Sequence, residues 1–189
     1  MQYRSFGNNS NFSYSIITNM ELKGQGFTLR GWYKEDAELL QKHADNINIS
    51  NYLFDRFPSP YTMADAEAFV SRKLNQNPIT SFVIAIDDQL AGVIGIDFRE
   101  DIYRKAPLLG YWLAEEYWGQ GIMTEVVKLV ADYAFENLDI VRLQSGVLAN
   151  NPGSMRVLEK AGFLKEGVLR NNIIKNGVIM DEYIYGMVR

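Results

Sequence analysis

The 189-residue sequence contains no cysteine and a single histidine, His43. Without cysteine the chain has neither a disulfide framework nor a thiol nucleophile, so covalent cysteine catalysis is excluded. One histidine rules out a metal site built from several histidines and argues against a serine triad. We therefore expect no metal in the site and no acyl-cysteine intermediate.

Positive charge and long hydrophobic runs are also scarce. The 19 Lys and Arg residues are outnumbered by 23 Asp and Glu residues, giving a net charge of −4. This balance argues against nucleic acid and against an anionic membrane surface as the main partner. No apolar run reaches membrane-spanning length, and the first residues lack the apolar core of a signal peptide. We expect a cytoplasmic protein.

The length predicts one domain with a substantial core. Residues 1–20 are rich in Asn and Ser with scattered aromatic residues, and we interpret them as a loosely ordered N-terminal extension. The remainder, residues 21–189, is expected to form a single domain. Because an aromatic extension is able to pack across a dimer, the sequence leaves both a monomer and a homodimer open.

Hydrophobic periodicity and turn residues predict a mixed α/β order. Thr62 and Asp65 have the spacing of a capping box, Asn151-Pro152 of a helix start, and Asn176-Gly177 of a hairpin turn. The expected strands cover residues 26–32, 80–98 (a hairpin), 108–113, 140–148 and, from Phe163 onward, a closing hairpin; the expected helices cover residues 34–46, 63–74, 121–137 and 151–162. This order predicts a largely antiparallel sheet with one crossover unit.

The crossover unit carries the clearest functional signal. An apolar strand, Leu108–Leu113, is followed by Trp118-Gly119-Gln120-Gly121 and then by an amphipathic helix. Unpaired amides and the dipole at a helix start attract a pyrophosphate, and glycines allow the backbone to approach it closely. A plain tight turn is the alternative. The polar start of segment 150–163 also follows a strand, so we expect it at the same edge of the sheet.

Two segments, LGYWLAEEYWGQGIMTEVV and NPGSMRVLEKAGF, together resemble the GNAT superfamily of acyl-CoA-dependent N-acetyltransferases. The order, the spacing and the closing hairpin resemble its RimJ/RimL-type branch, over roughly residues 27–188. The resemblance implies a twisted, largely antiparallel sheet flanked by helices, with a splayed central strand pair. It also implies acetyl-CoA as co-substrate.

The resemblance assigns roles to residues of this sequence. The backbone of Leu113 and Ala114 would bind the pantetheine arm, and Ser154 would lie near the thioester sulfur. The cofactor-binding residues so implied are Leu113, Ala114, Gly119, Gln120, Gly121, Ile122, Met123, Thr124, Asn151 and Ser154.

Three positions depart from the pattern of the superfamily. Glu116 stands where Arg or Gln often opens the glycine loop, Leu158 where many members have a tyrosine proton donor, and Leu108 where many RimL-type chains have Glu. Ser154 is therefore the remaining candidate acid. Our first candidate for the general base is Asp97, at the end of an apolar strand. The other carboxylates considered are Glu115, Asp181 and Glu182.

The function that the resemblance implies is direct acetyl transfer from acetyl-CoA to a primary amine of a protein N-terminus, a polyamine or a small molecule. The missing Glu and Tyr motivate an alternative, a non-catalytic acyl-CoA-binding module. A third interpretation is an unrelated phosphate-binding α/β protein. The aromatic segment with Tyr52, Phe54, Phe57 and Tyr61 is either part of the core or the wall of the acceptor site.

Overall fold

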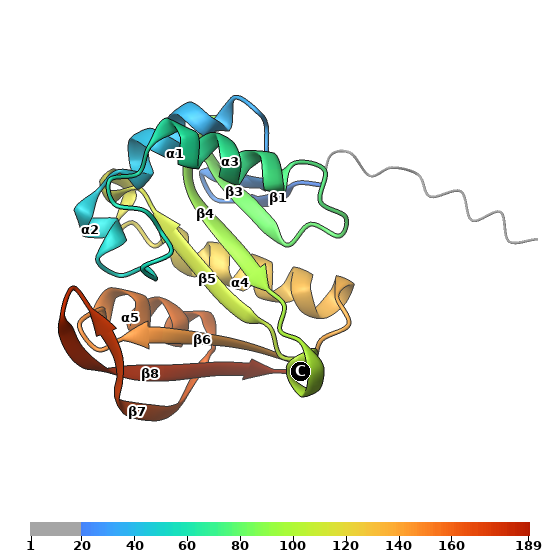
Figure 1. Ribbon diagram of the computed structural model, residues 1–189. Coiled ribbons are helices and arrows are strands. Elements are labelled where there is room, and N and C mark those ends of the chain that lie inside the picture. The colour runs from blue at the N-terminus through green and yellow to red at the C-terminus, as the bar shows by residue number, and fades with distance from the viewer. Residues whose placement is uncertain (1–19) are drawn as a thin grey trace, which may run out of the picture.

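An eight-stranded sheet with helices on both faces organises the chain in the computed structural model, which describes residues 20–189 (Figure 1). The strand order is β1-β2-β3-β4-β5-β6-β8-β7. The strands are β1 (Leu22–Gly24), β2 (Phe27–Arg30), β3 (Ser81–Ile86), β4 (Gln89–Asp97), β5 (Leu108–Leu113), β6 (Arg142–Leu148), β7 (Leu164–Lys175) and β8 (Val178–Val188).

Neighbouring strands are antiparallel everywhere except between β5 and β6. The helix α4 (Ile122–Asn137) makes the crossover between these two strands. This confirms the predicted largely antiparallel sheet with one crossover unit. The predicted extension, residues 1–20, lies outside the described residues apart from Met20.

Local capping explains where the other helices begin and end. Thr62 and Asp65 form the predicted capping box of α3 (Met63–Lys73). Asn151 caps α5 (Pro152–Ala161), which ends at Gly162 with a positive φ of 99°. Turn residues Asn176 and Gly177, with φ of 51° and 78°, join β7 to β8 as predicted. The remaining helices are α1 (Asp36–Ala44) and α2 (Ile47–Ser50), and short 3₁₀ turns cover Asp101–Tyr103 and Glu115–Tyr117.

The sheet separates two hydrophobic clusters. On one face, α4 and α5 pack through residues such as Val126, Val130 and Leu158 against the central strands. On the other face, α1 and α3 pack through Leu40 and Val70. Figure 1 shows these helices on the two sides of the strands. Within residues 20–189, no helix has both the length and the hydrophobicity required to cross a membrane.

The structure adds a short strand and a short helix to the predicted elements, and α1 begins later than expected. β1 and α2 have three and four residues and were not predicted, because so few residues show no periodicity. The helix expected over residues 34–46 is α1, which begins at Asp36. The Asp36 carboxylate is drawn into a buried ion pair with Arg30, with oxygen–nitrogen distances of 2.8 and 2.9 Å.

His43, in the last turn of α1, gives a prediction that one-dimensional NMR can check. Partial burial lowers its pKa from the ordinary 6.5. Protonation then favours the unfolded chain, so the free energy of unfolding should decrease as the pH falls from 6.5 through the pKa of the folded protein. As His43 is the only histidine, untagged protein has one titrating imidazole. Its titration midpoint should lie below 6.5 in the folded protein, and a midpoint at or above 6.5 would contradict this placement.

Candidate active site

The parallel strands β5 and β6 separate soon after they meet. They share a single register pair, Leu108 with Gln144, and the amide of Gln144 donates to the Pro107 carbonyl at 3.1 Å. Beyond this pair the strands diverge, and a cavity of about 860 Å³ lies along their separated ends. This confirms the predicted splayed central pair and places a cleft in the middle of the sheet.

Hydrogen-bond alternation identifies the backbone groups that face the cleft. Ala114 donates its amide to the Ala91 carbonyl of the strand on the outer side, at 2.7 Å. Antiparallel pairs alternate, so the backbone groups of Tyr111 and Leu113 point the other way, toward β6. By the same argument, the bond of 3.1 Å from Ala149 to Asp181 turns the backbone of Gly146 toward β5. Both edges of the gap therefore present main-chain donors and acceptors.

Leu113 and Ala114 differ in whether a backbone group still faces the gap. The Leu113 carbonyl accepts a hydrogen bond of 2.7 Å from the Trp118 indole, which leaves the amide of Leu113 facing the gap. Ala114 is buried, and its carbonyl accepts from Tyr117 at 3.0 Å. Since the Ala114 amide also bonds to Ala91, both backbone groups of Ala114 have partners within the protein, and its contact with pantetheine stays a prediction.

The glycine turn before α4 has the conformation of an anion site. Gly119 and Gly121 have φ values of 75° and 83°, in the left-handed region that favours glycine. Gly121 is the N-cap residue of α4, and no side chain of the described residues forms a capping hydrogen bond there. The amides of Ile122 and Met123 thus begin a helix that has no side-chain cap, and both residues line the cleft.

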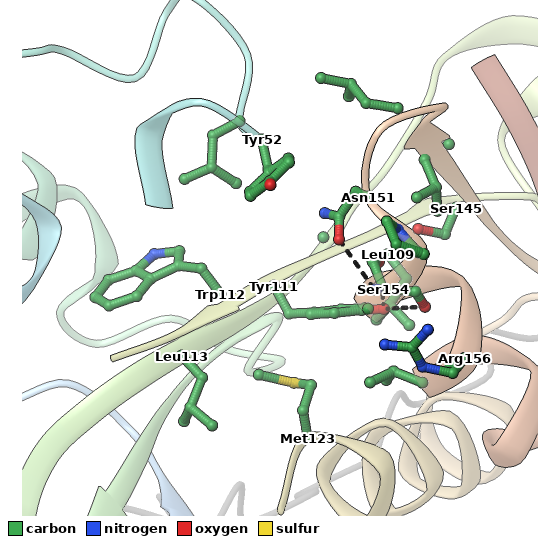
Figure 2. A pocket seen from close by; sticks show the side chains of 18 of the residues that line it. Tyr52, Leu109, Tyr111, Trp112, Leu113, Met123, Ser145, Asn151, Ser154 and Arg156 are labelled. Carbon is green, nitrogen blue, oxygen red and sulfur yellow. Dashed lines mark hydrogen bonds between the residues drawn. The ribbon is translucent and has the colours of Figure 1, made fainter. Parts of the chain in front are cut away.

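A polar contact between two strand–helix units also lines the cleft. The Asn151 side chain accepts the Ser154 amide at 3.0 Å, which fixes the first turn of α5. The Ser154 hydroxyl lies 2.9 Å from the Tyr111 hydroxyl, and either oxygen is able to donate (Figure 2). Burial raises the pKa of Tyr111 well above its usual value, although the Ser154 contact partly opposes this. Tyr111 therefore stays protonated at any physiological pH.

The sequence did not predict a role for the Tyr111 side chain or for two cations of the cleft. Arg156 and Lys160 lie four residues apart on α5, and both line the cleft from its helical wall. Figure 2 shows Arg156 on α5, the helix that also carries Ser154. The two cations supply the positive charge that is lacking between Lys105 and Lys128 in the sequence. In the sequence, the spacing of Arg156 and Lys160 on one predicted helix was the sign that both side chains share a face.

The structure separates the four candidate carboxylates. Asp97 lines the cleft, but its side chain is 61% exposed and pairs with Arg56 at 3.3 Å. Glu115 does not line it, and hydrogen bonds from Asn46 and Asn48 lower its pKa. Asp181 accepts the Asn171 amide and also lies off the cleft. Glu182 lines the cleft, is half-buried and accepts a bond of 2.7 Å from the Asn172 side chain.

The remaining predicted residues divide between the cleft and other positions. Gln120 lies outside the cleft and donates to the Glu116 carbonyl. Tyr52 and Phe54 line the cleft, whereas Phe57 and Tyr61 pack in the core beside α1 and α3. The predicted site residues that line the cleft are Asp97, Leu113, Gly119, Gly121, Ile122, Met123, Thr124, Asn151 and Ser154.

Comparisons with known proteins agree with the resemblance seen in the sequence. Residues 27–164 match the family described as acetyltransferase (GNAT) domain. A probable N-acetyltransferase, YjcK of Bacillus subtilis, is 46% identical over 161 residues, covering 78% of this chain and 85% of YjcK.

Two solved structures share the fold. The microcin C7 self-immunity acetyltransferase MccE in complex with acetyl-CoA and AMP has a TM-score of 0.73 and 26% identity, covering 88% of this chain and 94% of MccE. The ribosomal L7/L12 alpha-N-protein acetyltransferase RimL in complex with coenzyme A has a TM-score of 0.79 and 22% identity, covering 89% of this chain and 98% of RimL.

Proposed function

The chain belongs to the GNAT family of acetyltransferases, and on that premise we propose that it transfers the acetyl group of acetyl-CoA directly to a primary amine in the cleft between β5 and β6. The observation that carries this proposal is the open strand pair. Tyr111, Leu113 and Gly146 turn backbone groups into the gap, where an extended pantetheine arm is able to bond as an added strand.

The residues at the glycine turn fit the phosphates of coenzyme A. Gly119 and Gly121 take left-handed conformations just before the first amides of α4, and an added Cβ at either glycine would meet no atom within 4 Å. Arg156 and Lys160 add positive charge from the facing helix. Amides, helix dipole and two cations together suit a pyrophosphate.

In direct transfer, the residues in the middle of the cleft have specific catalytic roles. The amide of Leu113 faces the gap and is able to polarise the thioester carbonyl. As the amine attacks, the C–N bond forms, the C–S bond breaks, and the thiolate needs a proton. The Ser154 and Tyr111 hydroxyls, 2.9 Å apart, supply it as a connected pair. No covalent enzyme intermediate is required, in agreement with the absence of cysteine.

A panel of amines tests the proposed function. Pure protein is mixed with acetyl-CoA and with alkylamines, polyamines and N-terminal peptides, and free thiol is followed by absorbance. We expect thiol release that depends on the amine. Tight binding of coenzyme A without thiol release from any amine would instead support a non-catalytic acyl-CoA-binding module, which the absence of Glu at Leu108 and of Tyr at Leu158 motivates.

Gly121→Ala gives a prediction for the phosphate site. Its φ of 83° is strained for alanine, so the start of α4 should shift and the dissociation constant of coenzyme A should rise by about tenfold, a loss of about 1.4 kcal/mol. Calorimetric titration measures this change.

The matched control is Gly162→Ala. Gly162 has a φ of 99° but lies at the far end of α5, outside the cleft. The Gly162→Ala variant should lose about as much thermal stability as Gly121→Ala, while its affinity for coenzyme A should be unchanged. Equal affinity of both folded variants for coenzyme A would overturn the phosphate assignment.

A further inference from the structure

We propose that Glu182 takes the proton of the attacking amine, an inference that rests on the proposed acetyl transfer and goes beyond it by naming the base. Glu182 lies on β8, paired with Leu148 of β6, and its half-buried side chain lines the cleft. It is therefore close to the strand whose backbone faces the gap.

The alternation of side chains places Glu182 on the face opposite to α5. Three residues further along β8, the Tyr185 hydroxyl donates to Glu159 of α5 at 2.9 Å, so Tyr185 points toward the helices. Glu182 differs from it by an odd number of positions and points to the other face. Trp112 packs with the α1 and α3 cluster on that face, whereas Tyr111 reaches Ser154 on the helical face. Proton donor and proton acceptor thus reach the gap from opposite sides.

Gly146 shows how closely the carboxylate approaches the gap. A Cβ at this position would overlap the Glu182 Oε1 atom, so the carboxylate fills the space that a side chain of residue 146 would need. Glycine inside a strand costs roughly 0.5–1 kcal/mol relative to alanine. Here it lets a carboxylate lie directly against the β6 backbone that lines the cleft.

Hydrogen bonding fixes one oxygen of Glu182 and leaves the other for substrate. The Asn172 side chain donates to Oε2 at 2.7 Å, while Oε1 is the oxygen above Gly146. Among the ion pairs of residues 20–189, none involves Glu182, in contrast to Asp97 with Arg56. An unneutralised carboxylate suits both binding an ammonium group and accepting its proton.

The protons of the reaction can now be followed. The nitrogen lone pair forms the C–N bond as the C–S bond breaks, the amine proton passes to Glu182, and the sulfur receives a proton from the Ser154–Tyr111 pair. Glu182 then releases its proton to solvent and the hydroxyl pair takes one back from solvent, which restores both groups for the next turnover. The other titratable or charged groups that line the cleft are Tyr52, Asp97, Arg99, Tyr117, Arg156 and Lys160.

The test compares Glu182→Gln with the wild-type enzyme, using an alkylamine acceptor over a range of pH. At pH 7 we expect a loss in kcat of about 100-fold, in the range of general-base catalysis. Free alkylamine becomes abundant near its pKa of ~10, so the loss should shrink toward that pH. The affinity for coenzyme A should be unchanged. The control is Asp181→Asn, the adjacent carboxylate that lies off the cleft, which should keep wild-type kcat.

Two results would overturn the role of Glu182. One is a Glu182→Gln protein with wild-type kcat, and the other is a rise in KM alone with an unchanged pH profile, which would make Glu182 a docking group. The wild-type rate tests the proposed function separately. An active wild type with an equally active variant overturns the base alone, whereas a wild type that releases no thiol with any amine overturns both.

Discussion

Replacing Ser154 with alanine should lower kcat by about 100-fold, the range seen when a positioned proton donor is removed. The Ser154 hydroxyl contacts Tyr111 in the cleft, and its loss leaves the departing thiolate without a neighbouring donor. The affinity for coenzyme A should change little, because the amide that bonds to Asn151 remains in the variant. Stopped-flow thiol release and calorimetric titration measure the two quantities separately.

Tyr111→Phe shows whether the two hydroxyls act as a unit. Phenylalanine keeps the ring but removes the hydroxyl that lies 2.9 Å from Ser154. We expect a loss similar to that of Ser154→Ala, and a double variant no slower than the worse single variant. Ser71→Ala on α3 is the control and should keep full activity. If Ser154→Ala has the wild-type kcat, Ser154 has no role in proton transfer and serves only in the first turn of α5.

Asp36→Asn should lower the free energy of unfolding by about 3–5 kcal/mol, the usual cost of breaking a buried ion pair. Asp36 and Arg30 are 4% and 3% exposed, and two hydrogen bonds join them at 2.8 and 2.9 Å. Asp36 also accepts the Tyr33 amide at 2.7 Å. The variant would leave the Arg30 guanidinium buried, with only the exposed Asp88 carboxylate, 3.6 Å away, as a counter-charge. Urea unfolding followed by tryptophan fluorescence measures the change.

An exposed ion pair provides the comparison. Lys105 and Asp139 lie 2.6 Å apart, but their side chains are 47% and 86% exposed. Asp139→Asn should cost less than about 1 kcal/mol, as exposed pairs do. If Asp36→Asn cost no more than Asp139→Asn, the Arg30–Asp36 pair would not hold β2 to α1 as described.

Local chemistry made most of the fold predictable. The capping box at Thr62, the Asn cap at Asn151 and the Asn176-Gly177 turn each depend on residues within four positions of one another. Such contacts are readable in a sequence. The pair between Arg30 and Asp36 was not predicted, because its strength depends on burial under other elements and not on spacing.

The site was predicted unevenly for the same reason. The glycine turn and the Asn151–Ser154 cap were found because each is a continuous motif. Tyr111 lies 43 residues from Ser154, and only strand alternation with the buried Leu109 and Leu113 indicated the face on which it lies. Glu182 was one of four carboxylates considered for the general base. Its position above Gly146 depends on the pairing of β6 with β8, which the sequence does not show.

A single-turnover experiment tests the central claim, direct acetyl transfer in this cleft. The protein is mixed with equimolar acetyl-CoA, then with a primary amine, and quenched samples are analysed by mass spectrometry for acetylated amine, free coenzyme A and acetylated protein. For direct transfer we expect acetylated amine and free coenzyme A to appear together and at the same rate, with the protein mass unchanged throughout. Acetylated protein formed before the amine is added, or coenzyme A that stays acetylated after it, would contradict direct transfer.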